Sequence, residues 1–248
     1  MVRRLFFPVL ILLAGLVILN VFAFFQVRHF YEARLLEQLW PLGPPAPRLR
    51  IPATDETTVL LYGDSRIVDW ESPELHAGPV VNGGGNGLTT GQLALRLPAW
   101  LEACHPKIVV LEAGVNVIKI IGLRPDLYQA VLSQSLSNFN LMFEECRQHH
   151  AQVILLPVWP TNKISFLRRL VWNPAADRAV PDLNHQLMQA VAGRRDAVWL
   201  DLLSPLLHAT PENDREQIYR DDLHFNKSVY RQLTPLLDQA LATSFPGR

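Results

Sequence analysis

The chain has 248 residues, a length that suits one folded domain, and its 23 basic and 23 acidic residues give no formal net charge. Without a net positive charge there is no field to hold a polyanion, so nucleic-acid binding is not expected as the main function. An apolar fraction of 49% excludes a disordered chain, and two cysteines are too few for a disulfide scaffold or a four-thiolate zinc site.

An uncharged run, Leu5–Phe25, comes first. As a helix with a rise of about 1.5 Å per residue, it is long enough to span the hydrocarbon layer of a bilayer. A cleaved signal peptide has a shorter apolar region and small residues at its end, where this chain has Phe24 and Val27. We therefore expect a retained single-pass anchor over residues 1–25. A cleaved signal peptide and a buried core helix are the alternatives.

The residues after this run predict a tether. Proline is frequent over Pro41–Pro52, where it prevents a continuous helix and favours an extended chain, so residues 26–56 are expected to be a linker. Basic residues flank the apolar run on both sides, so the positive-inside rule favours one orientation only slightly. We expect a cytoplasmic amino terminus and an extracytoplasmic body, residues 57–245, on the periplasmic or cell-surface side.

The body alternates short apolar runs with helical patterns. The runs are rich in Val, Ile and Leu and lack polar alternation, as buried parallel strands do. They are Val59–Tyr62, Val80–Val81, Ile108–Leu111, Val153–Leu156 and Ala197–Leu200. The helical patterns are Gly91–Cys104, Asp126–His149, Asp182–Gly193 and Lys227–Ala242. Such strand–helix units predict an α/β fold, a three-layer α/β/α sandwich with a five-stranded parallel sheet, and they place ligand groups at the carboxyl ends of the strands.

Four polar motifs lie at these predicted ends. The first strand runs into residues 63–65 (GDS), the second into 82–87 (NGGGNG) and the third into 114–116 (GVN), while 221–224 (DDLH) precedes the last helix. A serine, an acid and a histidine in this order can form a hydrolytic triad, in which the histidine is the general base and the acid orients it. The elbow motif of ordinary α/β-hydrolases is absent, because Ile67 occupies the position of its second glycine.

Together, the four motifs resemble the four blocks of the SGNH (GDSL) hydrolases, and the resemblance extends over Thr58–Ala242. It implies that Ser65 is the nucleophile and that Asp221 and His224 complete the triad. Asp222 is the alternative orienting acid. The serine could instead be only a helix cap, and the histidine only a capping or packing residue.

The resemblance also implies an oxyanion hole. Ester cleavage needs donors for the oxygen of the tetrahedral intermediate, and the family pattern assigns the backbone N–H groups of Ser65 and Gly87 and the side-chain amide of Asn116. A glycine lets its N–H approach a ligand closely. Phosphate binding by the glycine run is the alternative, although the run lacks the spacing and the lysine of known phosphate loops.

Three residues depart from the family pattern. Val117 replaces the Asp that usually follows the asparagine of the third block, and Phe225 replaces the Pro that usually follows the histidine of the fourth block. Arg66 follows the nucleophile, where a small or apolar residue is common. We expect its side chain either to contact an anionic group of the substrate or to be solvated.

A long connection, Trp159–Val180, follows the fourth strand and is predicted to be a substrate-binding loop. Aromatic faces such as those of Trp159 and Trp172 stack on sugars or cover acyl chains, and Arg168 can pair with a carboxylate or phosphate. The alternative is a surface helix whose aromatic residues pack on the core.

No metal or cofactor is expected. Cys146, His149 and His150 can share a helix face, but no second ligand cluster is evident. The sheet order that the family implies, 2-1-3-4-5, makes the helices ending near Cys104 and Cys146 neighbours. Both a disulfide between these cysteines and two separate buried thiols are compatible with this arrangement.

The resemblance therefore implies a serine esterase that removes an ester-linked acyl group, with acetyl on an envelope or secreted polysaccharide as the first hypothesis. The expected partners are an ester-bearing small molecule, lipid or polysaccharide, and the membrane through the first helix. The alternatives are an acyltransferase with the same triad, a lysophospholipase or thioesterase, and a catalytically idle envelope assembly protein.

Overall fold

The computed structural model describes residues 2–39, 59–162, 172–211, 214 and 217–244. The chain divides into two units, Met1–Glu37 and Gln38–Arg248. Helix α1, Val2–Leu39, makes up the first unit and continues two residues beyond it, so residues 26–39 of the predicted linker are helical. Its segment Phe7–Glu37 reaches a mean hydropathy of 2.6 and is long and apolar enough to cross a membrane, a test that a signal sequence also passes.

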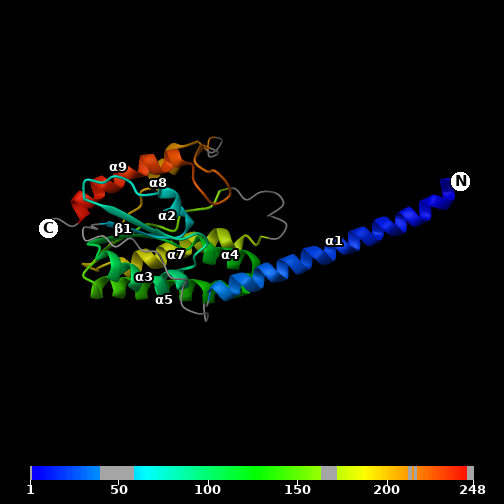
Figure 1. The fold of residues 1–248 in the computed structure, drawn as a ribbon, viewed down its shortest axis with the longest axis horizontal. Coiled ribbons are helices and arrows are strands. Elements are labelled where there is room, and N and C mark those ends of the chain that lie inside the picture. Colours follow the sequence, from blue (N-terminus) through cyan, green and yellow to red (C-terminus); the bar gives the residue numbers. More distant parts are fainter. Residues whose placement is uncertain (1, 40–58, 163–171, 212–213, 215–216, 245–248) are drawn as a thin grey trace. The chain divides into compact units, whose positions relative to one another are not determined.

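The second unit is built on a five-stranded parallel sheet in the order β2-β1-β3-β4-β5, as the sequence and the family resemblance predicted (Figure 1). Its strands are β1 (Val59–Gly63), β2 (Val80–Gly84), β3 (Ile108–Glu112), β4 (Gln152–Leu155) and β5 (Ala197–Trp199). Each lies within one or two residues of its predicted start.

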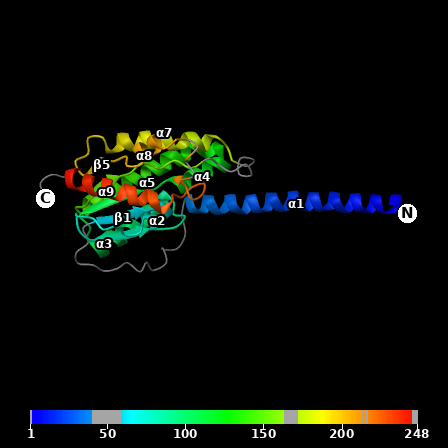
Figure 2. The ribbon, with the colours of Figure 1, turned by 90° about the horizontal axis from the view of Figure 1, so that it is seen from above.

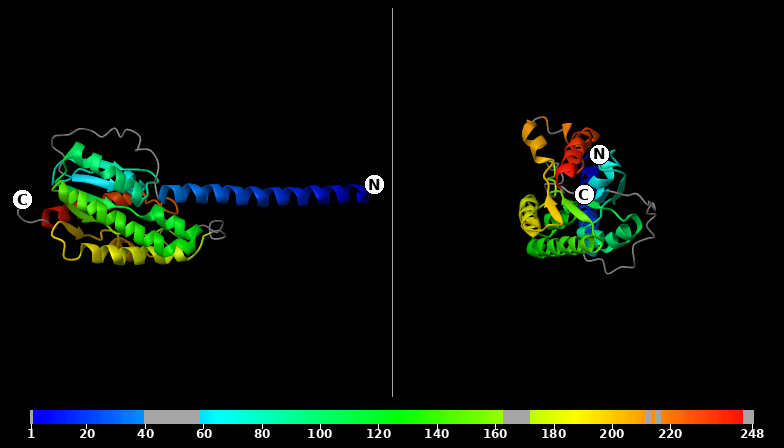
Figure 3. Two further views of the ribbon diagram at one scale, coloured as in Figure 1. Left: turned by 90° about the horizontal axis from the view of Figure 1, so that it is seen from below. Right: turned by 90° about the vertical axis from the view of Figure 1, so that its left-hand side faces the viewer.

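Helices cover both faces of this sheet (Figures 1 and 3). One face carries α2 (Ser65–Trp70), α8 (Ser204–Ala209) and α9 (Lys227–Ser244). The other carries α3 (Thr90–Cys104), α4 (Val115–Leu123), the short 3₁₀ helix η1 (Pro125–Leu127), α5 (Tyr128–Gln148) and α7 (Ala175–Val191). Figure 2 shows the same elements from above. Two covered faces explain why the strands are apolar at successive positions.

Strand β1 illustrates this packing, because its residues are fully buried and point alternately to the two faces. Val59 and Leu61 belong to the core that α9 covers. Tyr62 points to the opposite face, where its ring lies edge-on to Trp100 and its hydroxyl donates to the Leu93 carbonyl at 2.7 Å.

The strand register aligns the ends of the three strands that carry the polar motifs. Gly63 at the end of β1 pairs with Gly84 of β2 and with Glu112 of β3. A Cβ atom at residue 63 would lie 1.8 Å from the Glu112 carbonyl oxygen, so only glycine fits between these strands. The loops after β1, β2 and β3 therefore begin at one edge of the sheet.

Helices α2, α4 and α8 were not among the predicted helices, and α7 begins earlier than predicted. Helix α7 begins at Ala175 and not at Asp182, because Pro181 lies inside the helix and does not open it. The side-chain oxygen of Asn173 accepts the Ala175 N–H at 2.9 Å near the true start. Helix α4 was not predicted, because eight of its nine residues are buried and such a segment has no polar face to reveal a helical period.

The two cysteines are free thiols, so the structure favours separate buried side chains over a disulfide. Cys104 and Cys146 are at most 1% exposed. Burial raises the pKa of the Cys146 thiol to about 12, which leaves almost no reactive thiolate at neutral pH.

Candidate active site

Ser65 lies at the point where β1 ends and α2 begins. Asp64 is the N-cap of this helix, and its side chain accepts the N–H of Arg66 at 3.1 Å. The cap satisfies one of the free N–H groups of the first turn and fixes the backbone direction at Ser65. The aspartate of the GDS motif thus has a structural role, as the cap of the helix that begins at Ser65.

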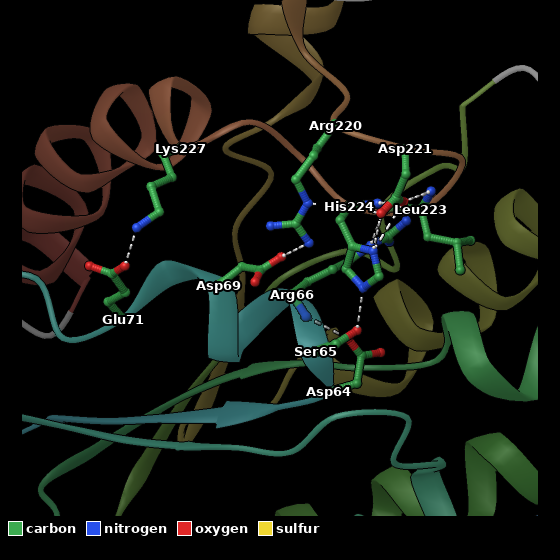
Figure 4. A network of polar contacts seen from close by, with 10 residues as sticks. All are labelled: Asp64, Ser65, Arg66, Asp69, Glu71, Arg220, Asp221, Leu223, His224 and Lys227. Atoms are coloured by element: carbon green, nitrogen blue, oxygen red, sulfur yellow. Dashed lines mark hydrogen bonds and ion pairs between the residues drawn. The ribbon is translucent and has the colours of Figure 1, made fainter.

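Ser65, His224 and Asp221 form one hydrogen-bonded chain (Figure 4). Ser65 Oγ lies 2.9 Å from His224 Nε2. On the far side of the ring, His224 Nδ1 lies 2.8 Å from Asp221 Oδ2 and 3.0 Å from Oδ1. In this arrangement a proton can pass from the serine hydroxyl to the imidazole while the carboxylate orients the ring.

The Asp221 carboxylate is also held by backbone groups. Its Oδ1 accepts the N–H groups of Leu223 and His224, each at 2.8 Å. Partial burial alone raises the pKa of Asp221, but these N–H groups and the histidine ring outweigh it and lower the pKa to about 2. The neighbouring Asp222 uses its backbone carbonyl to accept the Asn162 N–H at 2.9 Å. The structure thus brings Asp221 to His224.

The loop that carries the histidine closes on itself. Tyr219 and Phe225 form an antiparallel bridge, and the Arg220 N–H donates to the His224 carbonyl at 2.8 Å. The side-chain amide of Asn226 donates to the carbonyls of Gln217 and Tyr219 at 3.0 and 3.2 Å. This short hairpin presents both members of the Asp–His pair from one rigid turn.

Asn116 lies in the first turn of α4, and two contacts fix its amide. Its Nδ2 donates to the Leu88 carbonyl at 2.9 Å, and its Oδ1 accepts from Lys119 Nζ at 2.6 Å. A lysine only donates and a carbonyl only accepts, so the amide has one possible orientation. Asn116 is thereby tied to the segment that contains Gly87, whose φ of +71° lies in the left-handed region that favours glycine.

Two polar residues that support this region were not among the predicted site residues. Lys119, one helical turn after Asn116, orients its amide. Asn82 joins strand β2 to α2 and the residue that follows it: its amide donates to the carbonyls of Ile67, at 2.7 Å, and Glu71, and its oxygen accepts the Gly84 N–H at 2.9 Å. The sequence signal for Lys119 was its i+3 spacing from the asparagine.

A family model described as the GDSL-like lipase/acylhydrolase family matches residues 58–232. The chain belongs to this family of hydrolases. No curated protein matches the sequence. The matched region includes all the residues that form the hydrogen-bonded chain and its neighbouring loops.

Solved structures of several lipases and esterases share the fold. A GDSL-like lipase from Bacteroides thetaiotaomicron is 19% identical with a TM-score of 0.59, over 86% of this chain and 98% of that one. A lipase/acylhydrolase from Enterococcus faecalis is 20% identical with a TM-score of 0.53, over 77% and 99% of the two chains. A psychrotrophic esterase from Pseudoalteromonas sp., solved with monoethylphosphonate as inhibitor, is 16% identical with a TM-score of 0.50, over 75% and 96%.

Arg66 does not occupy either environment that was predicted for it in this GDSL domain. It is fully buried, so its side chain is neither solvated nor exposed to a substrate. Its guanidinium lies among backbone carbonyls, and Nη1 is 3.7 Å from Glu112 Oε1. The sequence interpretation was wrong because a long side chain beside the nucleophile can turn inward when buried acceptors and a carboxylate meet it.

The predicted substrate-binding aromatic residues pack on the body of the domain. Trp159 is 1% exposed and its ring lies 5.4 Å from that of Phe225, so the prediction that it contacts substrate is wrong. Trp172 is half-buried and packs against Gly122 of α4. Arg168 lies outside the described residues. Within the described ranges, no group of three or more His, Cys, Asp or Glu side chains is arranged to hold a metal ion.

Proposed function

We propose that this GDSL hydrolase is a serine esterase in which Ser65, His224 and Asp221 form the catalytic triad. The observation that carries the proposal is the chain of contacts from Ser65 Oγ to His224 Nε2 and from His224 Nδ1 to Asp221. His224 takes the hydroxyl proton as the Ser65 oxygen attacks the acyl carbon, and it later gives that proton to the leaving alkoxide. A water molecule then hydrolyses the acyl-enzyme with the same histidine as base.

The oxyanion of each tetrahedral intermediate is assigned to the backbone N–H groups of Ser65 and Gly87 and to the Asn116 amide. The Asn116 nitrogen carries two hydrogens. One is donated to the Leu88 carbonyl. We assign the other to the oxyanion, which makes the donor pre-oriented before substrate binds.

The experiment that tests the triad is covalent labelling of the full-length protein in detergent micelles with a fluorophosphonate. We expect the wild type to be labelled on Ser65 and Ser65→Ala to remain unlabelled with an unchanged thermal midpoint. Ser244→Ala, a serine of the last helix, is the matched control and should label normally. Labelling of Ser65→Ala at the wild-type rate would reject the assignment of the nucleophile.

The finer proposal concerns substrate and location. We infer that the acyl group is acetyl on an envelope or secreted polysaccharide and that α1 is a retained anchor with the hydrolase domain outside the cytoplasm. It is supported by the length and hydropathy of α1 and by the absence of small residues after its apolar run. Retention predicts resistance to extraction by alkaline carbonate, and a carboxyl-terminal reporter active only outside the cytoplasm tests the orientation.

A product analysis distinguishes the substrate classes. The full-length enzyme is incubated separately with an O-acetylated polysaccharide, a lysophospholipid and an acyl thioester, each with and without an alcohol acceptor. Release of acetate from the polysaccharide alone supports the proposal. Release of a long-chain acid points to a lipase or thioesterase, and transfer of the acyl group to the alcohol points to a transferase.

A further inference from the structure

Arg66 contacts backbone carbonyls from two other segments of the domain. Its Nη1 donates to the carbonyl of Trp159 at 2.5 Å and its Nη2 to that of Pro160 at 3.0 Å, both in the loop after β4. Its Nε donates to the carbonyl of Leu223 at 3.0 Å. One planar side chain thus joins the helix that carries Ser65 to two loops at the same edge of the sheet.

The Leu223 carbonyl is the last backbone group before His224. Because the peptide unit is planar, fixing this carbonyl also fixes the direction in which the His224 backbone begins. Figure 4 shows Arg66 and Ser65 together on α2, facing the loop that carries Leu223 and His224. The bond from Arg66 Nε therefore joins the helix of the proposed nucleophile directly to the histidine loop.

Phe225, on the other side of His224, contacts the same guanidinium. The Arg66 Cζ atom lies 5.2 Å from the centroid of the Phe225 ring, and that ring packs edge-on against Trp159. Such cation–π contacts strengthen when the cation is desolvated, as it is here. Arg66 and Phe225 are two of the three departures from the family pattern, and they meet each other across the loop.

Two buried carboxyl groups interact with Arg66 inside the protein. Glu112 Oε1 is 3.7 Å from Nη1, and the carboxyl of Asp64 is also fully buried. Burial raises the pKa of Glu112 and of Asp64 above their ordinary values, and the nearby arginine offsets only part of this rise. The guanidinium has donor groups only, so it depends on these buried oxygens as its partners. A buried pair of this kind is costly to break, which keeps the guanidinium in one place.

We propose that Arg66 is a positioning residue that holds the Asp221–His224 loop at the correct distance from Ser65. This inference rests on the proposed function of Ser65 and His224. The proposal depends on the planar guanidinium, because its N–H groups lie in one fixed plane and reach three carbonyl oxygens on two loops. A lysine keeps the charge but presents a single ammonium, which does not reproduce this geometry.

Arg66→Lys in the full-length protein in micelles tests the proposal. We expect the rate of fluorophosphonate labelling to fall about 10- to 100-fold, because a displacement of about 1 Å at the histidine has a cost of that order. The Michaelis constant for a small acetyl ester should change much less than kcat. In a His224→Ala background, Arg66→Lys should cause no further loss, because Arg66 acts through the histidine.

Arg194→Lys is the matched control. Arg194 also pairs with a carboxylate, Asp196, and lies 5.3 Å from an aromatic ring, that of Phe143, but outside the proposed site. Its replacement should leave labelling within twofold of the wild type. If Arg66→Lys behaves like this control, or slows labelling equally in the His224→Ala background, the proposal is rejected.

A second readout does not depend on the triad. Amide hydrogen exchange of residues 219–225 should increase in Arg66→Lys, while exchange in α5 stays unchanged. If wild-type labelling itself fails, the proposed function is wrong and this exchange alone decides whether Arg66 holds the loop. If Arg66→Lys does not fold, Phe225→Leu is the second variant. It removes the ring that contacts the guanidinium, so labelling should slow and exchange at residues 219–225 should increase, each about threefold. Unchanged exchange at residues 219–225 in the folded variant would reject the proposal.

Discussion

The two groups of polar residues around Ser65 are held in different ways. On the histidine side, Asp221 and His224 are partly exposed, with 48% and 24% of their side chains accessible, and a hairpin with backbone hydrogen bonds positions them. On the oxyanion side, Asn116 is only 4% exposed and is held by side-chain contacts to Lys119 and to the Leu88 carbonyl.

This difference matches the chemistry proposed for each side. A general base exchanges protons with the leaving group and with water, so access to solvent is useful for the imidazole. An oxyanion donor does not move or exchange; it is effective when it is already oriented, in a site from which water is excluded. The following predictions separate the two sides, because losing the base should cost far more than losing one donor.

The largest effect is expected for His224→Ala. Without a base, the Ser65 hydroxyl keeps its proton, and kcat should fall by about 10⁴- to 10⁶-fold at neutral pH. The measurement is the steady-state rate with an acetyl ester, and circular dichroism checks that the variant is folded. His185→Ala is the control: this exposed histidine of α7, whose Nε2 lies 2.9 Å from Gln189 Nε2, is outside the proposed triad, and its replacement should keep the wild-type rate.

Next in size is the loss of the orienting acid. Asp221→Asn should reduce kcat by about 10⁴-fold, because an amide favours the wrong tautomer of the histidine. Asp222→Asn is the matched neighbour and should stay within about threefold of the wild type, since its backbone carbonyl still accepts the Asn162 N–H. The opposite ranking would assign the role of the acid to Asp222.

Asn116→Ala should have a smaller effect, a fall in kcat of about 10²–10³-fold with little change in KM. The reason is that the donor acts on charge that develops in the transition state and not on the bound ester. Equal changes in kcat and KM, or a lowered thermal midpoint that accounts for the loss, would make Asn116 a structural residue.

The sequence predicted the strands and the four polar motifs, because each depends on short patterns: buried apolar runs and GDS, GVN or DxxH near their ends. The order of the strands came from the family resemblance that these motifs carry. It did not predict where Arg66 and Trp159 point. Their environment is set by Phe225, Glu112 and the loop after β4, which are distant in sequence, and nothing in the local pattern indicates whether a long side chain turns inward.

The missed helix α4 and the late start assigned to α7 have a related cause. Residues of α4 are buried on nearly all sides, so the helix has no amphipathic period. The predicted start of α7, Asp182, comes directly after Pro181, which lies inside the helix. The position of Lys119 beside Asn116 depends on α4 being a helix. The contact could therefore be predicted only after the helix was known.

Lys119→Met should lower kcat about tenfold, less than Asn116→Ala, because the amide remains but one of its two anchors is lost. In the Asn116→Ala background the same replacement should have no further effect, since the lysine acts through the amide. Lys227→Met, which removes an exposed lysine paired with Glu71, is the control and should leave kcat unchanged. Additive losses in the double variant would give Lys119 a separate role.

The smallest predicted effect is on acid stability. The pKa of Asp221 falls from its ordinary value of 3.8 to about 2 in the folded protein, so its ionised form stabilises the fold above pH 4, and this contribution is lost as the pH falls through about 2. The thermal midpoint of the wild type should therefore fall more steeply between pH 4 and pH 2 than that of Asp221→Asn. The side chain is about half exposed, so solvent screening keeps the difference small.

Glu144→Gln sharpens the test. Arg147 likewise holds the pKa of Glu144 at about 2, on the surface of α5, so in this variant the thermal midpoint should also fall less steeply between pH 4 and pH 2, while kcat stays unchanged. Parallel pH profiles for the wild type and Asp221→Asn would show that the carboxylate is not held in its ionised form by the His224 loop.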